Sequence, residues 1–176
     1  ALTNRAQPTQ PANRGYEFRD AGGDSDSAEL LIYSEIGPWA DWGDVSAESF
    51  AGQLGQVTAK NLTVRLNSPG GSVWEGLAIA NLIRSHPANV TMVVDGIAAS
   101  IASIIMLAGD TIIMGPQAQV MIHDALTIGY GNAADLRELA DLLDRQSDNL
   151  ARAYATRAGG RYDTWRNRMK AETWFS

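Results

Sequence analysis

The sequence predicts an α/β protein with a largely parallel sheet, and two patterns lead to this prediction. Short runs rich in β-branched residues alternate along the chain with longer segments in which apolar residues recur every three or four positions. Turns rich in glycine, proline or asparagine separate the two kinds of segment. Such alternation is typical of folds in which helices connect parallel strands. With 176 residues, the chain has the length of one domain with a sizeable core.

The N-terminal part predicts an arm followed by the first repeating units. Residues 1–28 are polar and rich in Gly, Pro, Asn and Ser, so we expect a flexible N-terminal arm and a single domain over residues 29–176. Ser46 is a good cap for a helix that ends near Leu54. The other expected elements here are a strand at 29–36, a loop at 37–43, a strand at 62–66, a turn at 67–72 and a helix at 73–85.

The second half of the chain contains the longest predicted helix, over residues 133–158. Asn132 is its expected cap, Gly159 follows its end, and Asp148 and Arg152 form one of two expected acid–base pairs along it. One apolar stripe runs along this helix: Leu136, Leu139, Leu143, Leu150 and Tyr154. Before it we expect a strand at 90–94, a tight turn at Gly96, a helix opening at Ser100, and strands at 111–114 and 119–123.

Composition excludes several classes of function. The net charge is −6 and no basic run occurs, so we expect no nucleic-acid partner. The longest apolar stretch, residues 97–109, is too short to cross a membrane. The chain has no cysteine, which excludes thiol catalysis. Its two histidines, His86 and His123, lie far apart in sequence, so we expect neither a metal ion nor another cofactor.

Ser100 is the first candidate for catalytic chemistry. It follows an apolar strand and the small residues 96–99, at the expected start of a helix. Free backbone N–H groups and the helix dipole at such a position favour a developing oxyanion. The alternative interpretation is a serine that merely caps the helix.

Two further motifs supply what a serine nucleophile needs. His123 ends a strand and precedes a glycine-bearing loop, so it can serve as a general base, whereas His86 precedes Pro87 in an expected surface turn. The paired glycines of residues 67–71, NSPGG, allow backbone N–H groups to approach a ligand. The alternative interpretation of that motif is an ordinary strand–helix turn.

Taken in order, SPGG, DGIAAS and MIH resemble the ClpP-like serine peptidases of the ClpP/crotonase superfamily, over residues 30–176. The resemblance implies a ClpP/crotonase-like fold of repeated β-α units with a long handle helix that packs one ring of subunits against another. It also implies that Ser100 is the nucleophile and His123 the general base. The N–H groups of Gly71 and Ile101 are then expected to form the oxyanion hole.

The resemblance leaves the third member of the catalytic triad open. The family has an Asp shortly before a segment similar to residues 174–176, and Glu172 stands at the matching position. Asp163 is the alternative. Asp124 neighbours His123 but is expected to point to the opposite face of the strand. The family continues with a further helix and strand, and one hypothesis is that such a tail is lost here by self-cleavage.

The implied function is that of a serine endopeptidase acting on peptides or proteins in a homo-oligomeric ring, in the cytoplasm of a bacterium. The long helix and residues 172–176 are most similar to phage head-maturation (prohead) proteases, which implies capsid or scaffold proteins as partners and a prohead as the site of action. The arm lacks the N-terminal pattern of the housekeeping peptidase, which disfavours a Clp-type ATPase partner. A housekeeping Clp proteolytic subunit working with an ATPase remains an alternative.

The sequence is compatible with three further functions. The Glu at position 172 leaves room for a catalytically impaired scaffold or assembly module. A Ser–Lys dyad would need Lys60 or Lys170, and neither lies near a motif. A crotonase-type acyl-CoA enzyme would use the oxyanion amides without the placed Ser and His.

Overall fold

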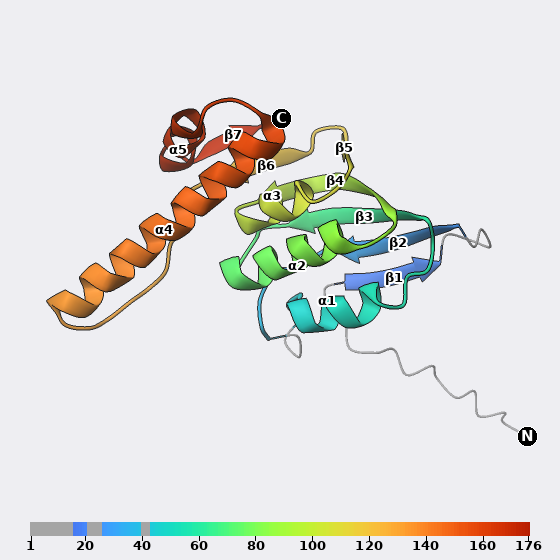
Figure 1. Cartoon of the computed structure of the whole chain (residues 1–176), viewed down its shortest axis with the longest axis horizontal. Coiled ribbons are helices and arrows are strands. Elements are labelled where there is room, and N and C mark those ends of the chain that lie inside the picture. Colours follow the sequence, from blue (N-terminus) through green and yellow to red (C-terminus); the bar gives the residue numbers. More distant parts are fainter. Residues whose placement is uncertain (1–15, 21–25, 40–42) are drawn as a thin grey trace, which may run out of the picture.

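The computed structural model describes residues 16–20, 26–39 and 43–176. They form a mixed sheet with the strand order β1-β2-β3-β4-β6-β7, in which β5 also pairs with β4 (Figure 1). The elements are, in chain order, β1 Tyr16–Asp20, β2 Ser27–Ile32, α1 Ala47–Leu54, β3 Asn61–Ser68, α2 Val73–Ser85, β4 Asn89–Ala99, α3 Ile101–Met106, β5 Thr111–Met114, β6 Gln119–Ile122, α4 Ala133–Ala158, α5 Tyr162–Lys170 and β7 Thr173–Phe175.

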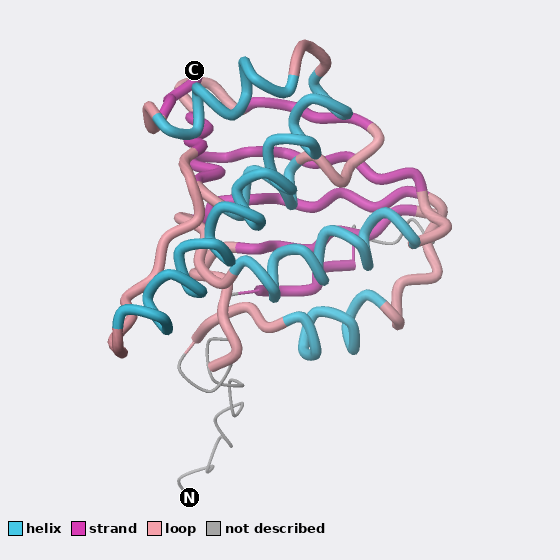
Figure 2. Tube along the Cα trace, turned by 60° about the vertical axis from the view of Figure 1, so that its left-hand side comes forward, coloured by secondary structure: helices cyan, strands magenta, loops and turns pink. Residues whose placement is uncertain are grey.

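The sheet confirms the predicted α/β class. Strands β2 to β6 pair in parallel, and only the two edge strands of the described sheet, β1 and β7, pair antiparallel with their neighbours. Figure 2 shows the helices lying in front of the strands. Alternate residues of β3 are buried, as expected for a strand covered on one face. None of the helices in the described part of the chain is both long and apolar enough to cross a membrane.

Local signals place three helices where the sequence predicts them. Ser46 caps α1, and its side chain accepts a hydrogen bond from the backbone N–H of Ser49. Asn132 and Asp135 form a capping box at the start of α4. Helices α2 and α4 have the predicted bounds, because caps and apolar periodicity agree at these positions.

The predicted turn at Gly96 is wrong, because β4 continues through this residue to Ala99 and pairs there with β6. The glycine has a different role. A Cβ atom at Gly96 would lie 2.7 Å from Oδ1 of Asn67, the atom that accepts a hydrogen bond from the N–H of Ile97 at 3.2 Å. Gly96 therefore makes room for a side chain that joins the ends of β3 and β4.

The N-terminal region also differs from expectation. Residues 16–20, inside the expected flexible arm, form β1 and pair with β2. The expected boundary between residues 28 and 29 falls within β2, which begins at Ser27. Residues 1–15 and 21–25 of the arm, and 40–42 of the expected loop, lie outside the described residues.

Helix α4 is divided into two unlike halves. Its second half packs on the core, with Leu150 and Tyr154 buried, whereas Leu136 in the first half is exposed. Figure 1 shows the first turns extending away from the sheet. Asp148 also departs from the predicted pairing with Arg152, because its carboxylate binds Arg166 of α5 at 2.9 Å.

Candidate active site

The backbone at Ser100 is strained and held from both sides. Between β4 and α3, Ser100 adopts φ 53° and ψ −129°, a conformation that L residues rarely adopt and that persists only where the surroundings impose it. Its N–H donates to the carbonyl of Met121 at 2.9 Å. Its carbonyl accepts from the N–H of Ser103 at 3.0 Å and from Oγ of Ser103 at 2.5 Å. These bonds fix the orientation of the strand–helix turn.

The Ser100 side chain is directed at His123. Its Oγ lies 2.8 Å from Nε2 of the imidazole, which follows directly after β6. The side chain makes no capping hydrogen bond to α3, so the interpretation of Ser100 as a plain helix cap is wrong. With the imidazole proton on Nδ1, Nε2 accepts a hydrogen bond from the Ser100 hydroxyl, which is the arrangement that a serine nucleophile and its general base require.

The glycine loop before α2 lies directly against Ser100. Gly70 has φ +99°, and a Cβ atom there would lie 2.7 Å from Cβ of Ser100. Gly71 has φ +140°, and a Cβ atom there would lie 2.0 Å from the carbonyl oxygen of Ile36. Only glycine fits this close approach, so the turn is more specialised than an ordinary strand–helix connection.

The expected oxyanion donors face the same pocket as Ser100. A cavity of about 200 Å³ is lined by Gly71, Ile101, Ser100 and His123, among others, with Leu150 and Tyr154 of α4 on its wall. In the described part of the chain, the N–H groups of Gly71 and Ile101 donate to no other backbone or side-chain atom. Both are therefore free to bind a ligand oxygen beside Ser100.

The structure does not bring either candidate acid to His123. Glu172 lies between α5 and β7 with its side chain exposed and φ 47°. Asp163 is also exposed and forms an ion pair with Arg161 at 3.4 Å. Within residues 16–20, 26–39 and 43–176, no hydrogen bond or ion pair joins a carboxylate to His123. In the same residues, no three His, Asp or Glu side chains gather to hold a metal ion.

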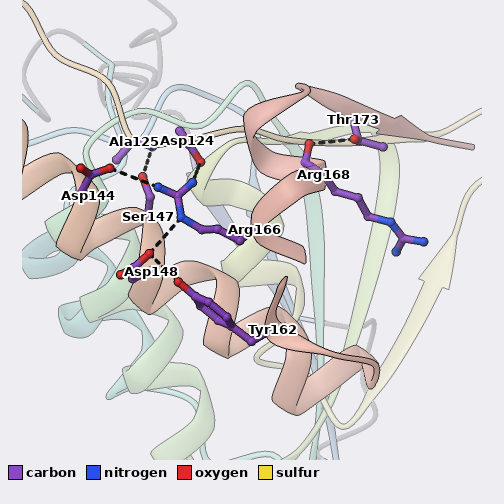
Figure 3. A network of polar contacts seen from close by, with 9 residues as sticks. All are labelled: Asp124, Ala125, Asp144, Ser147, Asp148, Tyr162, Arg166, Arg168 and Thr173. Carbon is purple, nitrogen blue, oxygen red and sulfur yellow. Dashed lines mark hydrogen bonds and ion pairs between the residues drawn. The ribbon is translucent and has the colours of Figure 1, made fainter. Parts of the chain in front are cut away.

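Sequence reasoning missed a charged cluster around Arg166, which Figure 3 shows. Arg166 of α5 is buried and forms a short ion pair with Asp124, the residue after His123. Asp148 and Asp144 of α4 bind the same guanidinium at 2.9 and 3.3 Å. The hydrogen bond to Asp124 is the main cause that raises the pKa of Arg166. The cluster ties the segment after His123 to α4 and α5.

The chain belongs to the Clp protease family, because the family model described as Clp protease matches residues 43–176. A proteolytic subunit of ATP-dependent Clp protease from Leuconostoc citreum is 30% identical over 141 residues, which cover 76% of this chain and 70% of the relative. The corresponding subunit from Pleurastrum terricola is 32% identical over 120 residues, which cover 67% and 61%.

The structural comparison agrees with the family. A point mutant of ClpP1 from Listeria monocytogenes superposes with a TM-score of 0.73 and 25% identity, over 87% of this chain and 84% of that protein. The ClpP-like fold implied by the sequence motifs is thus confirmed. The chain spans about three-fifths of the length of the first curated relatives it matches, 61% and 56%.

Proposed function

We propose that this protein is a serine endopeptidase in which Ser100 is the nucleophile and His123 the general base. Oγ of Ser100 forms a bond to the peptide carbonyl carbon while its proton passes to Nε2 of His123. The N–H groups of Gly71 and Ile101 hold the oxyanion. The imidazolium then gives its proton to the leaving amine as the C–N bond breaks, and a water molecule, deprotonated by His123, hydrolyses the acyl-enzyme.

The observation that carries this proposal is the 2.8 Å contact between Oγ of Ser100 and Nε2 of His123. The contact lies in a pocket that is also lined by Gly71 and Ile101, whose N–H groups make no hydrogen bond within the described residues. A scaffold that had lost catalysis would have no need to keep Ser100 in a strained conformation. The geometry therefore favours the enzyme over the impaired scaffold.

We assign Glu172 as the acid that orients His123, with Asp163 as the alternative. Glu172 precedes β7, and β7 pairs with β6, the strand that leads to His123. This pairing brings the backbone of the segment beside the base. The exposed Glu172 side chain would complete the triad by turning toward His123, without a change in the fold.

We further propose that the peptidase works as a ring of identical subunits. The first half of α4 and the segment before it carry apolar side chains that are exposed in this subunit: Leu126, Ile128, Tyr130 and Leu136. Packing against other subunits would bury this surface. The names of the relatives, proteolytic subunits of ATP-dependent Clp protease, favour an ATPase-assisted housekeeping role. Phage head maturation, with capsid or scaffold proteins as partners, stays a prediction from the long helix and residues 172–176.

A fluorophosphonate probe, which forms a covalent bond to an activated serine, tests the proposal. We expect intact-mass spectra to show one adduct on the wild type and on Ser85→Ala, a control that removes an exposed serine. Ser100→Ala should show none, and its peptidase activity should fall by on the order of 10⁶-fold. A Ser100→Ala variant with full activity would contradict the proposal. Assembled rings that the probe does not label in native mass spectra would favour the scaffold.

A further inference from the structure

A chain of hydrogen bonds connects helix α4 to the backbone of Ser100. Oγ of Ser103 lies 2.5 Å from the carbonyl oxygen of Ser100 and 2.6 Å from the hydroxyl of Tyr154. Ser103 and Tyr154 are 0% and 4% exposed, so water does not compete for these contacts. A carbonyl oxygen can only accept, so the single hydroxyl proton of Ser103 goes to Ser100. Tyr154 must therefore donate to Ser103.

The Ser103 bond alone has a local explanation, but the Tyr154 bond does not. A serine within a helix often donates to the carbonyl three or four residues earlier. Tyr154 comes from a different helix, 51 residues further along the chain. Burial raises the pKa of Tyr154 to about 12, so its hydroxyl keeps the donated proton at neutral pH.

The ring of Tyr154 is itself held in place. It stacks on Trp165 of α5 with ring centres 5.4 Å apart, and Tyr154 lines both the pocket of Ser100 and an apolar cavity of about 230 Å³. A ring that is almost fully buried and stacked on a neighbouring side chain has little freedom to turn. The direction of its hydroxyl toward Ser103 is therefore set by the packing of α4 and α5.

We propose that Tyr154 and Ser103 are positioning residues for the nucleophile. The orientation of the Ser100 carbonyl is the ψ angle of that residue, and ψ is −129° beside a φ of 53°. The bonds from Tyr154 through Ser103 hold this carbonyl and so keep Oγ directed at His123. The inference rests on the proposed peptidase function and extends it to two residues that touch neither the substrate nor the reacting atoms.

The test compares single and double variants in peptide hydrolysis. We expect Ser103→Ala to lower kcat about tenfold and Tyr154→Phe about three- to fivefold, the range for losing one buried hydrogen bond. The double variant should be no slower than Ser103→Ala, because both changes break one chain. KM should stay within about twofold, since Phe preserves the pocket wall. Tyr162→Phe is the matched control: it removes a hydroxyl that tethers α4 through Asp148, and it should retain the wild-type kcat.

Labelling of wild-type Ser100 by the fluorophosphonate probe establishes the enzyme independently of these variants. Unchanged kcat in both variants, with the wild type labelled, overturns the inference and leaves the proposed function intact. An equal loss in Tyr162→Phe also overturns it, because general loosening of α4 would then be the cause. A change confined to KM would assign Tyr154 to substrate binding instead. Thermal unfolding of each variant at neutral pH checks that the comparison is between folded proteins.

Discussion

Ser100 and Glu172 both have a positive φ, 53° and 47°, which is uncommon for residues other than glycine, but their surroundings differ. At Ser100 the N–H and carbonyl are bonded to two other segments, and the side chain meets His123. At Glu172 the N–H closes the end of α5 on the carbonyl of Met169, and the side chain is exposed. A strained backbone therefore indicates function where the surrounding structure imposes the strain and the side chain of the same residue contacts another polar group. The proposed nucleophile is therefore already directed at His123 in this structure, whereas the proposed acid is not.

Among changes that test this comparison without removing Ser100 itself, the largest effect is expected from Gly70→Ala, which disturbs the surroundings of Ser100. The new methyl group would lie 2.7 Å from Cβ of Ser100, at a φ of +99° that alanine avoids. A displacement of about 1 Å at a reacting group lowers rates by about 100-fold, and we expect a loss of that order in kcat/KM. Gly52→Ala is the control, because nothing lies within 4 Å of its new Cβ. Full activity of Gly70→Ala would show that the glycine loop does not position Ser100.

A smaller loss of activity is expected from Glu172→Gln, which changes the proposed acid. The amide cannot stabilise the imidazolium, so we expect kcat/KM to fall about tenfold or more, less than the roughly 10⁴-fold loss seen where a buried triad acid is changed to its amide. Asp163→Asn should leave the rate unchanged. The reverse pattern would assign the acid to Asp163. Equal activity of both variants and the wild type would mean that Ser100 and His123 act without an acid.

The smallest effect concerns the contacts that anchor α5, the helix before Glu172. Hydrogen bonds from Tyr162 and then Arg166 lower the pKa of Asp148. A lowered pKa in the folded state gives stability that is present above the unfolded pKa and lost as the pH falls through the folded one. We expect the unfolding temperature to fall less between about pH 5 and pH 3 in Asp148→Asn than in the wild type, by a few degrees at most. Parallel curves for the two proteins would contradict this assignment.

The sequence predicted best what local signals determine. Ser46 and Asn132 cap helices because their side chains bond to nearby N–H groups, an interaction that depends on a few consecutive residues. Ser100, His123 and the glycine pair could be found because each stands at the junction of two predicted elements. Their order along the chain then led to the family.

Contacts between distant segments could not be predicted in this way. The strand β4 continues through Gly96 because β6 pairs with it, and sheet pairing overrode the local turn signal. The ion pairs of Arg166 join three segments, and the bond from Tyr154 to Ser103 spans 51 residues. No spacing within one element indicates such partners. The exposure of the Glu172 side chain likewise could not be predicted, because it depends on how distant segments pack around this residue.

Helix α4 also has the proportions of a lever. If it turns about the buried Leu150, its free end at Ala133 lies about 26 Å to one side and Tyr154 about 6 Å to the other, at about 1.5 Å per residue. A displacement of about 2 Å at the free end then arrives at Tyr154 as about half an ångström. That is the scale on which a hydrogen bond lengthens or breaks. A large displacement at the free end of the helix would thus become a small displacement of the Tyr154 hydroxyl beside Ser103 and Ser100.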